Sequence, residues 1–287
     1  MSQNRRMDMH GSALVTGASR GIGRAIALEL AERGFDTVAT MRDPDAGRGI
    51  EDETTGRLQV RRLDVTDPST YEMPDDLCVL VNNAGIDTEY LPVEFGRVED
   101  WRRMFETNVF GLVSLTSAAI PTLRDNRPSV VCNVTSSSIL GPMPFYSAYR
   151  ASKAAVSAFG DSLRVEVAPF GIRVVEILPG PVDTDMFRLS TGDMDAMRYD
   201  DYRELATVAT TLRRQHADPR VVEPAEAARS VVDAILDSSG PMRHGCDPIS
   251  REMVELWRQC DDETLFAVTG RSLLDMATAS DAGGPGA

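Results

Sequence analysis

A glycine-rich turn near the start of this 287-residue chain most constrains its fold. The apolar run from Ala13 to Thr16 predicts a buried strand, and the sequence TGASRGIG follows at once over residues 16–23. The run RAIALELAER over residues 24–33 then predicts a helix that ends at Gly34. Glycines let the backbone approach a pyrophosphate, and a helix N-terminus presents free N–H groups to it. The unit therefore predicts nucleotide binding; a turn shaped only for packing is the alternative.

Strand and helix patterns alternate along most of the chain. Strands are expected at Asp36–Met41, Leu58–Leu63, Leu77–Val81 and Ile172–Leu178, with a central strand from Val130 and a last strand or turn at Pro241–Gly245. Helices are expected at Val98–Ala119, after Ser147 and at Ala225–Leu236. This alternation predicts an α/β fold with a doubly wound parallel sheet, the Rossmann fold, whose ligands bind at the carboxyl ends of the strands.

One connection in this sheet is short. Twelve residues, Thr66 to Leu77, link the third expected strand to the fourth, and Pro68 and Pro74 interrupt them. A crossover between parallel strands needs at least about that many residues, so we expect no more than a stub of helix there.

We expect one domain with segments added at both ends. Residues 1–11 form a polar tail, residues 12–250 the domain, and residues 251–287 an acidic extension that is helical to Leu274 and disordered from Ala279. Within the domain, residues 185–223 are rich in methionine and charge. A long, partly helical excursion beside a ligand site is often functional, so we expect this segment to be a substrate lid.

Net charge and composition exclude several classes of partner. The formal net charge of -14 disfavours binding to nucleic acid or to an anionic membrane. No apolar run reaches the length of a membrane span, and the first ten residues lack the apolar core of a signal peptide. The four cysteines show no C-x-x-C spacing and the three histidines no ligand-like spacing, so we expect reduced thiols and no metal. These patterns predict a cytoplasmic protein.

Three side chains near the central strand are expected to meet. Tyr149 and Lys153 are four residues apart on the expected helix and share a face, and Ser136 lies 13 residues before Tyr149, where the strand should end. A neighbouring ammonium lowers the pKa of a phenol, and a serine hydroxyl can donate a hydrogen bond to a substrate oxygen. The spacing therefore predicts proton transfer to or from an alcohol or carbonyl oxygen. A solvated helix face is the alternative reading of the tyrosine–lysine pair.

The tip of the second expected strand bears on the choice of cofactor. An acidic residue there holds the ribose hydroxyls of NAD, whereas a basic residue accommodates the 2′-phosphate of NADP. Met41 takes the tip, Arg42 comes next, and Arg20 lies in the glycine-rich turn. Two arginines suit a phosphate, so NADP(H) is favoured over NAD(H). Solvated surface charges are the alternative, and the nearby Asp43 weakens the inference.

Together these motifs resemble the short-chain dehydrogenase/reductase family, in its shorter single-domain branch. The matching residues, in the family's order, are TGxxxGxG over residues 16–23, Asp64, NNAG over residues 82–85, Asn108, Ser136, Tyr149 with Lys153, and Pro179-Gly180 with Thr184. The resemblance covers roughly residues 12–185, and the acidic extension continues past the usual end of the family. The patterns around residues 37–44 and 241–246 are more loosely similar to the hydroxysteroid-dehydrogenase-like members.

The resemblance implies a catalytic role for four residues. Tyr149 would be the catalytic acid or base, and Lys153 would modulate its pKa and anchor the ribose. Ser136 would donate to the substrate oxygen, and Asn108 would belong to a proton relay.

The resemblance also implies a set of cofactor-binding residues. Asp64 would face the adenine and Thr184 the nicotinamide amide. The full expected set is Gly17, Ser19, Arg20, Gly21, Ile22, Gly23, Arg42, Asp64, Val65, Asn83, Ala84, Gly85, Tyr149, Lys153, Pro179, Gly180, Val182 and Thr184.

The implied activity is that of an NADP(H)-dependent oxidoreductase that interconverts a secondary alcohol and a ketone, as a ketoreductase or hydroxy-dehydrogenase. One alternative is an enoyl reductase, because Tyr146 precedes Lys153 by seven residues, a spacing similar to that of enoyl reductases in the same superfamily. Tyr149 is preferred because Ser136 and Asn108 fit it. The other alternative is a nucleotide-sensing regulator without turnover. The resemblance also suggests a homodimer or homotetramer.

Large apolar residues flank the expected site in sequence. They are Met143, Phe145, Tyr146, Met186 and Phe187, and Met194 and Met197 follow in the excursion. Such side chains fit irregular apolar shapes, and no basic cluster beyond Arg188 accompanies them. The pattern predicts a bulky, mostly apolar ketone or alcohol of polyketide or steroid-like size. For Met194 and Met197, packing of the lid onto the domain is the alternative.

Overall fold

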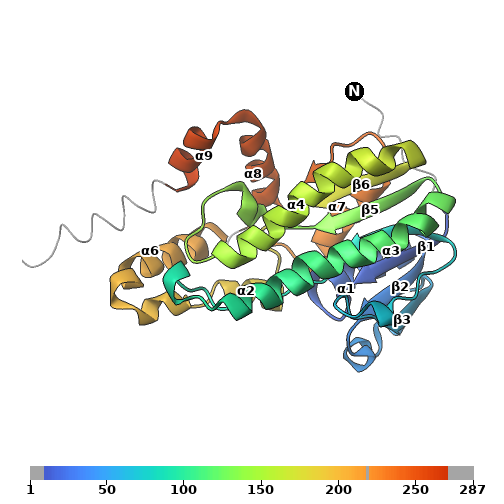
Figure 1. The fold of residues 1–287 in the computed structure, drawn as a ribbon, viewed down its shortest axis with the longest axis horizontal. Helices are drawn as coiled ribbons and strands as arrows, with labels where there is room; N and C mark the ends of the chain where they lie inside the picture. The colour runs from blue at the N-terminus through green and yellow to red at the C-terminus, as the bar shows by residue number, and fades with distance from the viewer. Residues whose placement is uncertain (1–9, 218–219, 271–287) are drawn as a thin grey trace, which may run out of the picture.

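A seven-stranded sheet forms the centre of the computed structural model, which describes residues 10–217 and 220–270 (Figure 1). Its order is β3-β2-β1-β4-β5-β6-β7, and neighbouring strands are parallel. The strands are β1 (Ser12–Thr16), β2 (Asp36–Met41), β3 (Leu58–Arg62), β4 (Leu77–Asn82), β5 (Ser129–Val134), β6 (Ile172–Ile177) and β7 (Arg243–His244). The expected doubly wound parallel sheet is confirmed, with the first six strands within one residue of their expected bounds.

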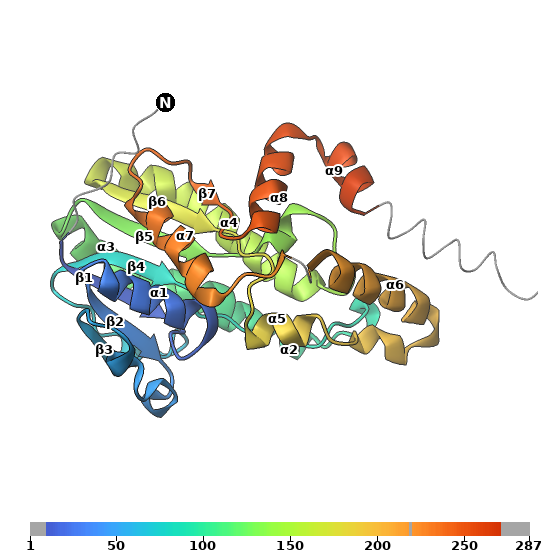
Figure 2. The same cartoon turned by 180° about the vertical axis from the view of Figure 1, so that it is seen from behind.

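Helices cover both faces of the sheet. Helices α3 (Leu112–Asp125) and α4 (Ser147–Val167) lie on the face toward the viewer in Figure 1. Helices α1 (Gly21–Glu32) and α7 (Pro224–Leu236) pack side by side on the opposite face (Figure 2). The central strands are therefore buried on both sides, which is why they read as continuous apolar runs rather than as alternating patterns.

The connection from β3 to β4 is the stub that its length predicted. It contains a single turn of 3₁₀ helix, Pro68–Thr70. The Tyr71 hydroxyl donates to the carbonyl of Val65 at 2.6 Å. The Tyr71 ring packs on the apolar cluster between the sheet and helices α3 and α4. An aromatic side chain thus covers part of the surface that a crossover helix would bury.

The excursion after β6 is partly helical, as expected. It contains α5 (Asp185–Ser190), a 3₁₀ turn and α6 (Asp200–Ala217), and it extends beyond one end of the sheet (Figure 1). Met194 is buried in a cluster with Tyr90 and Tyr146, and Met197 packs against that cluster. These two methionines therefore attach the excursion to the domain. Its role as a lid stays a prediction.

The C-terminal extension is two helices, α8 (Pro248–Gln259) and α9 (Asp262–Thr269), rather than one helical stretch from Arg251. Helix α8 begins at Pro248, three residues earlier than expected, because Asp247 caps it through a capping box with Ser250. The expected disordered end and most of the N-terminal polar tail lie outside the described residues. No helix in the ranges that the structure describes is long and apolar enough to cross a membrane.

The buried Asp247 carboxylate joins the C-terminal extension to the loop that follows β6. It accepts hydrogen bonds from the Ser250 N–H at 2.9 Å, the Ser250 hydroxyl at 2.6 Å and the Gly180 N–H at 2.7 Å. Gly180 belongs to the loop after β6, so one carboxylate holds both the start of α8 and that loop.

We therefore predict that Asp247→Ala lowers the free energy of unfolding by about 3 kcal/mol, because it leaves buried N–H groups unpaired. The matched control is Asp261→Ala, since Asp261 caps α9 from an exposed position, and its effect should be much smaller. Urea unfolding of both variants measures the difference. Equal losses would show that the buried bonds contribute nothing beyond an ordinary cap.

Candidate active site

A cleft at the carboxyl ends of the strands contains nearly all the residues that the sequence predicted. It is lined by the glycine-rich turn, the ends of β2 to β5, the start of α4, the loop after β6 and α5. Every residue predicted to be catalytic or to bind the cofactor lines it except Asn108. Their roles stay predictions, but the structure brings these distant segments to one place.

The glycine-rich turn is held against β4 by the side chain of Asn83. The Asn83 amide Nδ2 donates to the carbonyls of Thr16 at 2.9 Å and Gly17 at 3.2 Å. Gly17 and Gly21 adopt φ angles of 65° and 59°, which favour glycine. A Cβ at Gly23 would lie 2.2 Å from Asn83 Nδ2. This close packing leaves the backbone and the N-terminus of α1 at the cleft, which fits the pyrophosphate of a dinucleotide.

The two arginines predicted to bind a 2′-phosphate both line the cleft, and Arg42 does so directly after β2. Met41 is buried at the strand end, and Arg42 follows it in an exposed position. Arg20 is exposed, with its Nη1 3.4 Å from a carboxylate oxygen of Asp185 at the opposite rim. Asp43, which weakened the inference, accepts a hydrogen bond from the backbone of its own turn at 3.0 Å and does not line the cleft.

Ser136, Tyr149 and Lys153 come together beside the end of β5. Lys153 is buried, and its ammonium donates to the carbonyl of Val134, the last residue of β5, at 2.9 Å. Burial lowers the pKa of Lys153 to about 8. The Ser136 hydroxyl accepts from the N–H of Ser138 at 3.2 Å and hydrogen-bonds the Tyr149 phenol. The predicted trio therefore forms.

The pKa of Tyr149 is raised, which is opposite to the shift expected from its spacing to Lys153. Desolvation is the largest cause, the Asp87 carboxylate raises the pKa further, and the hydrogen bond with Ser136 lowers it. The Lys153 ammonium, which donates to the Val134 carbonyl and lies 5.9 Å from the centroid of the Tyr149 ring, does not outweigh these effects. The phenol is therefore held in its protonated form.

Asn108 lies behind the cleft wall. It sits in a π-helical turn, Glu106–Gly111, between α2 (Val98–Phe105) and α3. Its amide donates to the Ile86 carbonyl at 2.9 Å and the Ser152 hydroxyl at 3.0 Å, and its Oδ1 accepts from the Ile86 N–H at 2.8 Å. Asn108 thus fixes the loop after β4 against α4, and its place in a proton relay stays a prediction.

Sequence reasoning missed two charged residues of the cleft, Asp87 and Arg213. Asp87 lines the cleft, where its carboxylate accepts from the Tyr90 hydroxyl at 2.6 Å, and burial raises its pKa. Arg213 of α6 also lines the cleft. The TLRRQH segment around Arg213 looks like a solvated helix face, so nothing local indicated that this side chain reaches a site 60 or more residues away in sequence.

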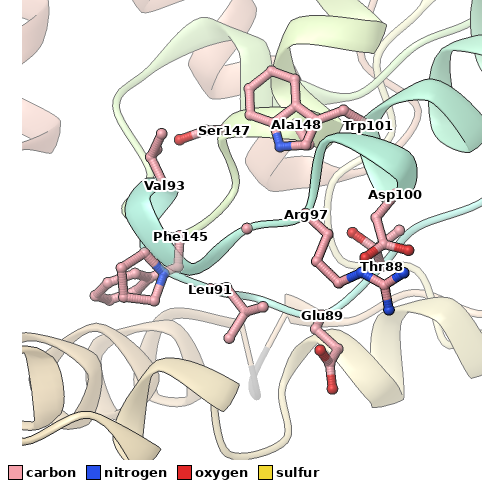
Figure 3. Close-up of a pocket in the computed structure, with 12 residues that line it drawn as sticks. Thr88, Glu89, Leu91, Val93, Arg97, Asp100, Trp101, Phe145, Ser147 and Ala148 are labelled. Carbon is pink, nitrogen blue, oxygen red and sulfur yellow. The ribbon is translucent and has the colours of Figure 1, made fainter.

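The residues expected to shape the substrate pocket separate into two groups. Tyr146, Met186 and Phe187 line the cleft. Phe145 instead faces a second, smaller pocket, formed by the loop that begins at Thr88, the start of α2 and the start of α4 (Figure 3). Met143 packs against the cluster that contains Tyr146 and does not line the cleft.

Tyr146, the alternative catalytic tyrosine, is buried and already bonded. Its hydroxyl donates to the Ser190 carbonyl at 3.1 Å, and its ring stacks on Tyr90 with 4.3 Å between centroids. Within the described ranges, no group of three His, Cys, Asp or Glu residues could hold a metal ion.

Comparison with known proteins agrees with this geometry. A model of the short chain dehydrogenase family matches residues 12–195. The uncharacterised oxidoreductase YusZ of Bacillus subtilis is 34% identical over 232 residues, 73% of this chain and 81% of that protein. The 3-oxoacyl-[acyl-carrier-protein] reductase FabG of Escherichia coli is 36% identical over 194 residues, 64% of this chain and 78% of that protein. The crystal structure of a short chain dehydrogenase from Burkholderia cenocepacia in complex with NADP has a TM-score of 0.70 at 26% identity, covering 91% of this chain and 98% of that one.

A doubly wound sheet with a glycine-rich turn after its first strand and a tyrosine–lysine pair beside its central strand defines a class of nucleotide-dependent oxidoreductases. The family match makes the assignment specific. The chain belongs to the short-chain dehydrogenase/reductase family, as the motifs predicted, and is an NAD(P)-dependent oxidoreductase acting on CH–OH groups.

The electrostatics of the cleft give a testable shift. Asp87→Asn removes a negative charge that disfavours the Tyr149 phenolate, so we predict that the pKa of Tyr149 falls and its tyrosinate forms at lower pH. Alkaline absorbance titration measures this, with Tyr149→Phe in the same background subtracted to isolate Tyr149. The control Asp195→Asn alters a carboxylate that accepts from the Tyr90 backbone and should leave the titration unchanged. An unchanged titration in Asp87→Asn would exclude Asp87 as a cause.

Proposed function

We propose that this enzyme interconverts a secondary alcohol and a ketone, with Tyr149 moving the proton. The observation that carries the proposal is the joint placement of Ser136, Tyr149 and Lys153 in the cleft. When bound, the dinucleotide supplies or accepts the hydride. The Ser136 hydroxyl donates to the substrate oxygen, and the Tyr149 phenol gives its proton to that oxygen during reduction.

Ketone reduction is the proposed direction. A protonated phenol can give its proton to the oxygen on which charge develops during reduction. The reductase FabG, a relative named for reducing a 3-oxoacyl group, supports the same direction.

The alternatives are less well supported. The Tyr146 hydroxyl donates to the Ser190 carbonyl, so it lacks a free proton for an enoyl reductase mechanism. A nucleotide-sensing regulator would not need Lys153 buried at the cleft, since burying an ammonium is unfavourable.

NADP(H) is the proposed cofactor. Arg20 and Arg42 line the cleft, and at the end of β2 Met41 supplies no carboxylate for ribose hydroxyls. The Burkholderia cenocepacia structure, which contains NADP, supports this choice.

The proposed substrate is bulky and mostly apolar, because Met186 and Phe187 give the cleft an apolar wall. The free thiols of Cys78, Cys132 and Cys246 are buried, which supports a cytoplasmic setting. A homodimer or homotetramer stays a prediction.

Replacement of each tyrosine tests the reaction. Tyr149→Phe should lower kcat by about 10²–10⁴-fold, the usual contribution of general acid catalysis, while NADPH binding by fluorescence titration persists. Tyr146→Phe should retain most of the activity. Consumption of NADPH with a panel of ketones and enones is the assay. Loss of activity in Tyr146→Phe alone, or turnover of enones only, would favour the enoyl reductase instead.

Cofactor preference is tested separately. The intact enzyme should bind NADPH at least about tenfold more tightly than NADH, because one charge-assisted contact can supply that difference. Arg42→Ala should lower the affinity for NADPH and leave the affinity for NADH nearly unchanged. Arg48→Ala is the control, since Arg48 is exposed, pairs with Asp45 and does not line the cleft. Equal affinities in the intact enzyme would refute the NADP(H) assignment.

A further inference from the structure

Two neighbouring arginines of α6 have different surroundings. Arg214 is exposed, and its guanidinium pairs with Asp193 at 3.1 Å. Arg213 instead lines the cleft, with its guanidinium carbon 4.5 Å from the centroid of the Tyr146 ring and 6.0 Å from that of Tyr90. The excursion therefore brings one cation to the cleft and leaves the next at the surface.

The Arg213 guanidinium is incompletely paired. Its Nη2 donates to the uncharged Ser190 hydroxyl at 2.6 Å, and its Nη1 is buried with no hydrogen-bond partner among the described residues. Arg173, which is also partly buried, likewise has one unpartnered nitrogen, its Nε, but its two terminal nitrogens donate to the carbonyls of Ala234, Ile235 and Asp237. Burial lowers the pKa of Arg213 to about 10, although the nearby Asp87 carboxylate opposes the shift, because a desolvated cation is unfavourable.

The charges at this end of the cleft leave a positive excess. Lys153 and Arg213 each carry a positive charge, and Asp87 supplies a negative one. The Asp87 carboxylate is already engaged by the Tyr90 hydroxyl at 2.6 Å and the Thr88 N–H at 2.8 Å. One further monoanion would balance the three groups, whereas a phosphate dianion would reverse the excess.

We infer that the substrate is an oxo acid, or the corresponding hydroxy acid: a ketone or secondary alcohol whose chain carries one carboxylate bound by Arg213. The planar guanidinium matches a carboxylate, and the rings of Tyr146 and Tyr90 shield the pair from water. The apolar part of the chain would lie against Met186 and Phe187, which line the same cleft. The inference rests on the proposed function, because it names the substrate class of that site, and it adds an anionic end to the apolar substrate expected from sequence.

The test compares oxo acids with their neutral esters. The probes are levulinate and its homologues with one and two further methylene groups, each paired with its methyl ester, so that several carbonyl-to-carboxylate spacings are sampled. With NADPH, the intact enzyme should give a kcat/KM at least about tenfold higher for one acid than for its ester. Arg213→Met should lower the kcat/KM for that acid by about 10–100-fold and change the ester little. Arg214→Met, the matched control, should change neither.

A binding measurement keeps this inference separate from the proposed function. Calorimetric titration of the oxo acids into the enzyme with NADP⁺ should show binding that Arg213→Met abolishes and Arg213→Lys partly retains. Arg213-dependent binding without turnover of any ketone would refute the ketoreductase proposal and leave the carboxylate site standing. The carboxylate site would be overturned if ketones were reduced but every acid and its ester gave the same kcat/KM. It would also be overturned if Arg213→Met left the binding of the acids unchanged.

Discussion

The parallel direction of every strand is the constraint on which the site depends. Because all the strands run the same way, their carboxyl ends meet at one edge of the sheet, and each following loop begins there. Residues as distant in sequence as Gly17, Asn83 and Thr184 therefore line one cleft. The hydrogen bond from Lys153 to the Val134 carbonyl then ties α4 to the end of β5, which places Tyr149 beside Ser136.

Desolvation sets the protonation of the groups that meet in this cleft. Burial raises the pKa of Tyr149 and Asp87 and lowers the pKa of Lys153 and Arg213. In each case burial shifts the equilibrium toward the neutral form, as expected where water is scarce, but Lys153 and Arg213 stay charged at neutral pH. The cleft therefore presents a protonated phenol to the substrate while its two cations lack full compensation. A proton donor and a weakly paired guanidinium in one cleft suit the reduction of an anionic ketone.

The sequence predicted what local patterns encode. The TGASRGIG turn, the apolar strands and the i,i+4 spacing of Tyr149 and Lys153 each depend on neighbours in the chain, and the structure contains all of them. Arg213 and Asp87 were missed because their importance comes from tertiary packing that no local pattern records. The pKa of Tyr149 was predicted in the wrong direction for a related reason: spacing indicates that Lys153 is near, but not that burial and the Asp87 carboxylate raise the phenol's pKa. The early start of α8 did have a local signal, since Asp247, Pro248 and Ser250 form a capping sequence.

Ser190 shows how the excursion and the fixed part of the site act together. Its carbonyl accepts from Tyr146, its hydroxyl accepts from Arg213, and that hydroxyl donates to the Phe187 carbonyl at 2.7 Å. One residue thus joins the start of α4, the end of α5 and the far end of α6. Because Tyr146 lies three residues before Tyr149 on the chain, its bond to Ser190 joins α5 to the start of the helix that carries Tyr149. Arg213 reaches the same joint through the Ser190 hydroxyl and through its place over the Tyr146 ring, so its position does not depend on the Tyr146 hydroxyl alone.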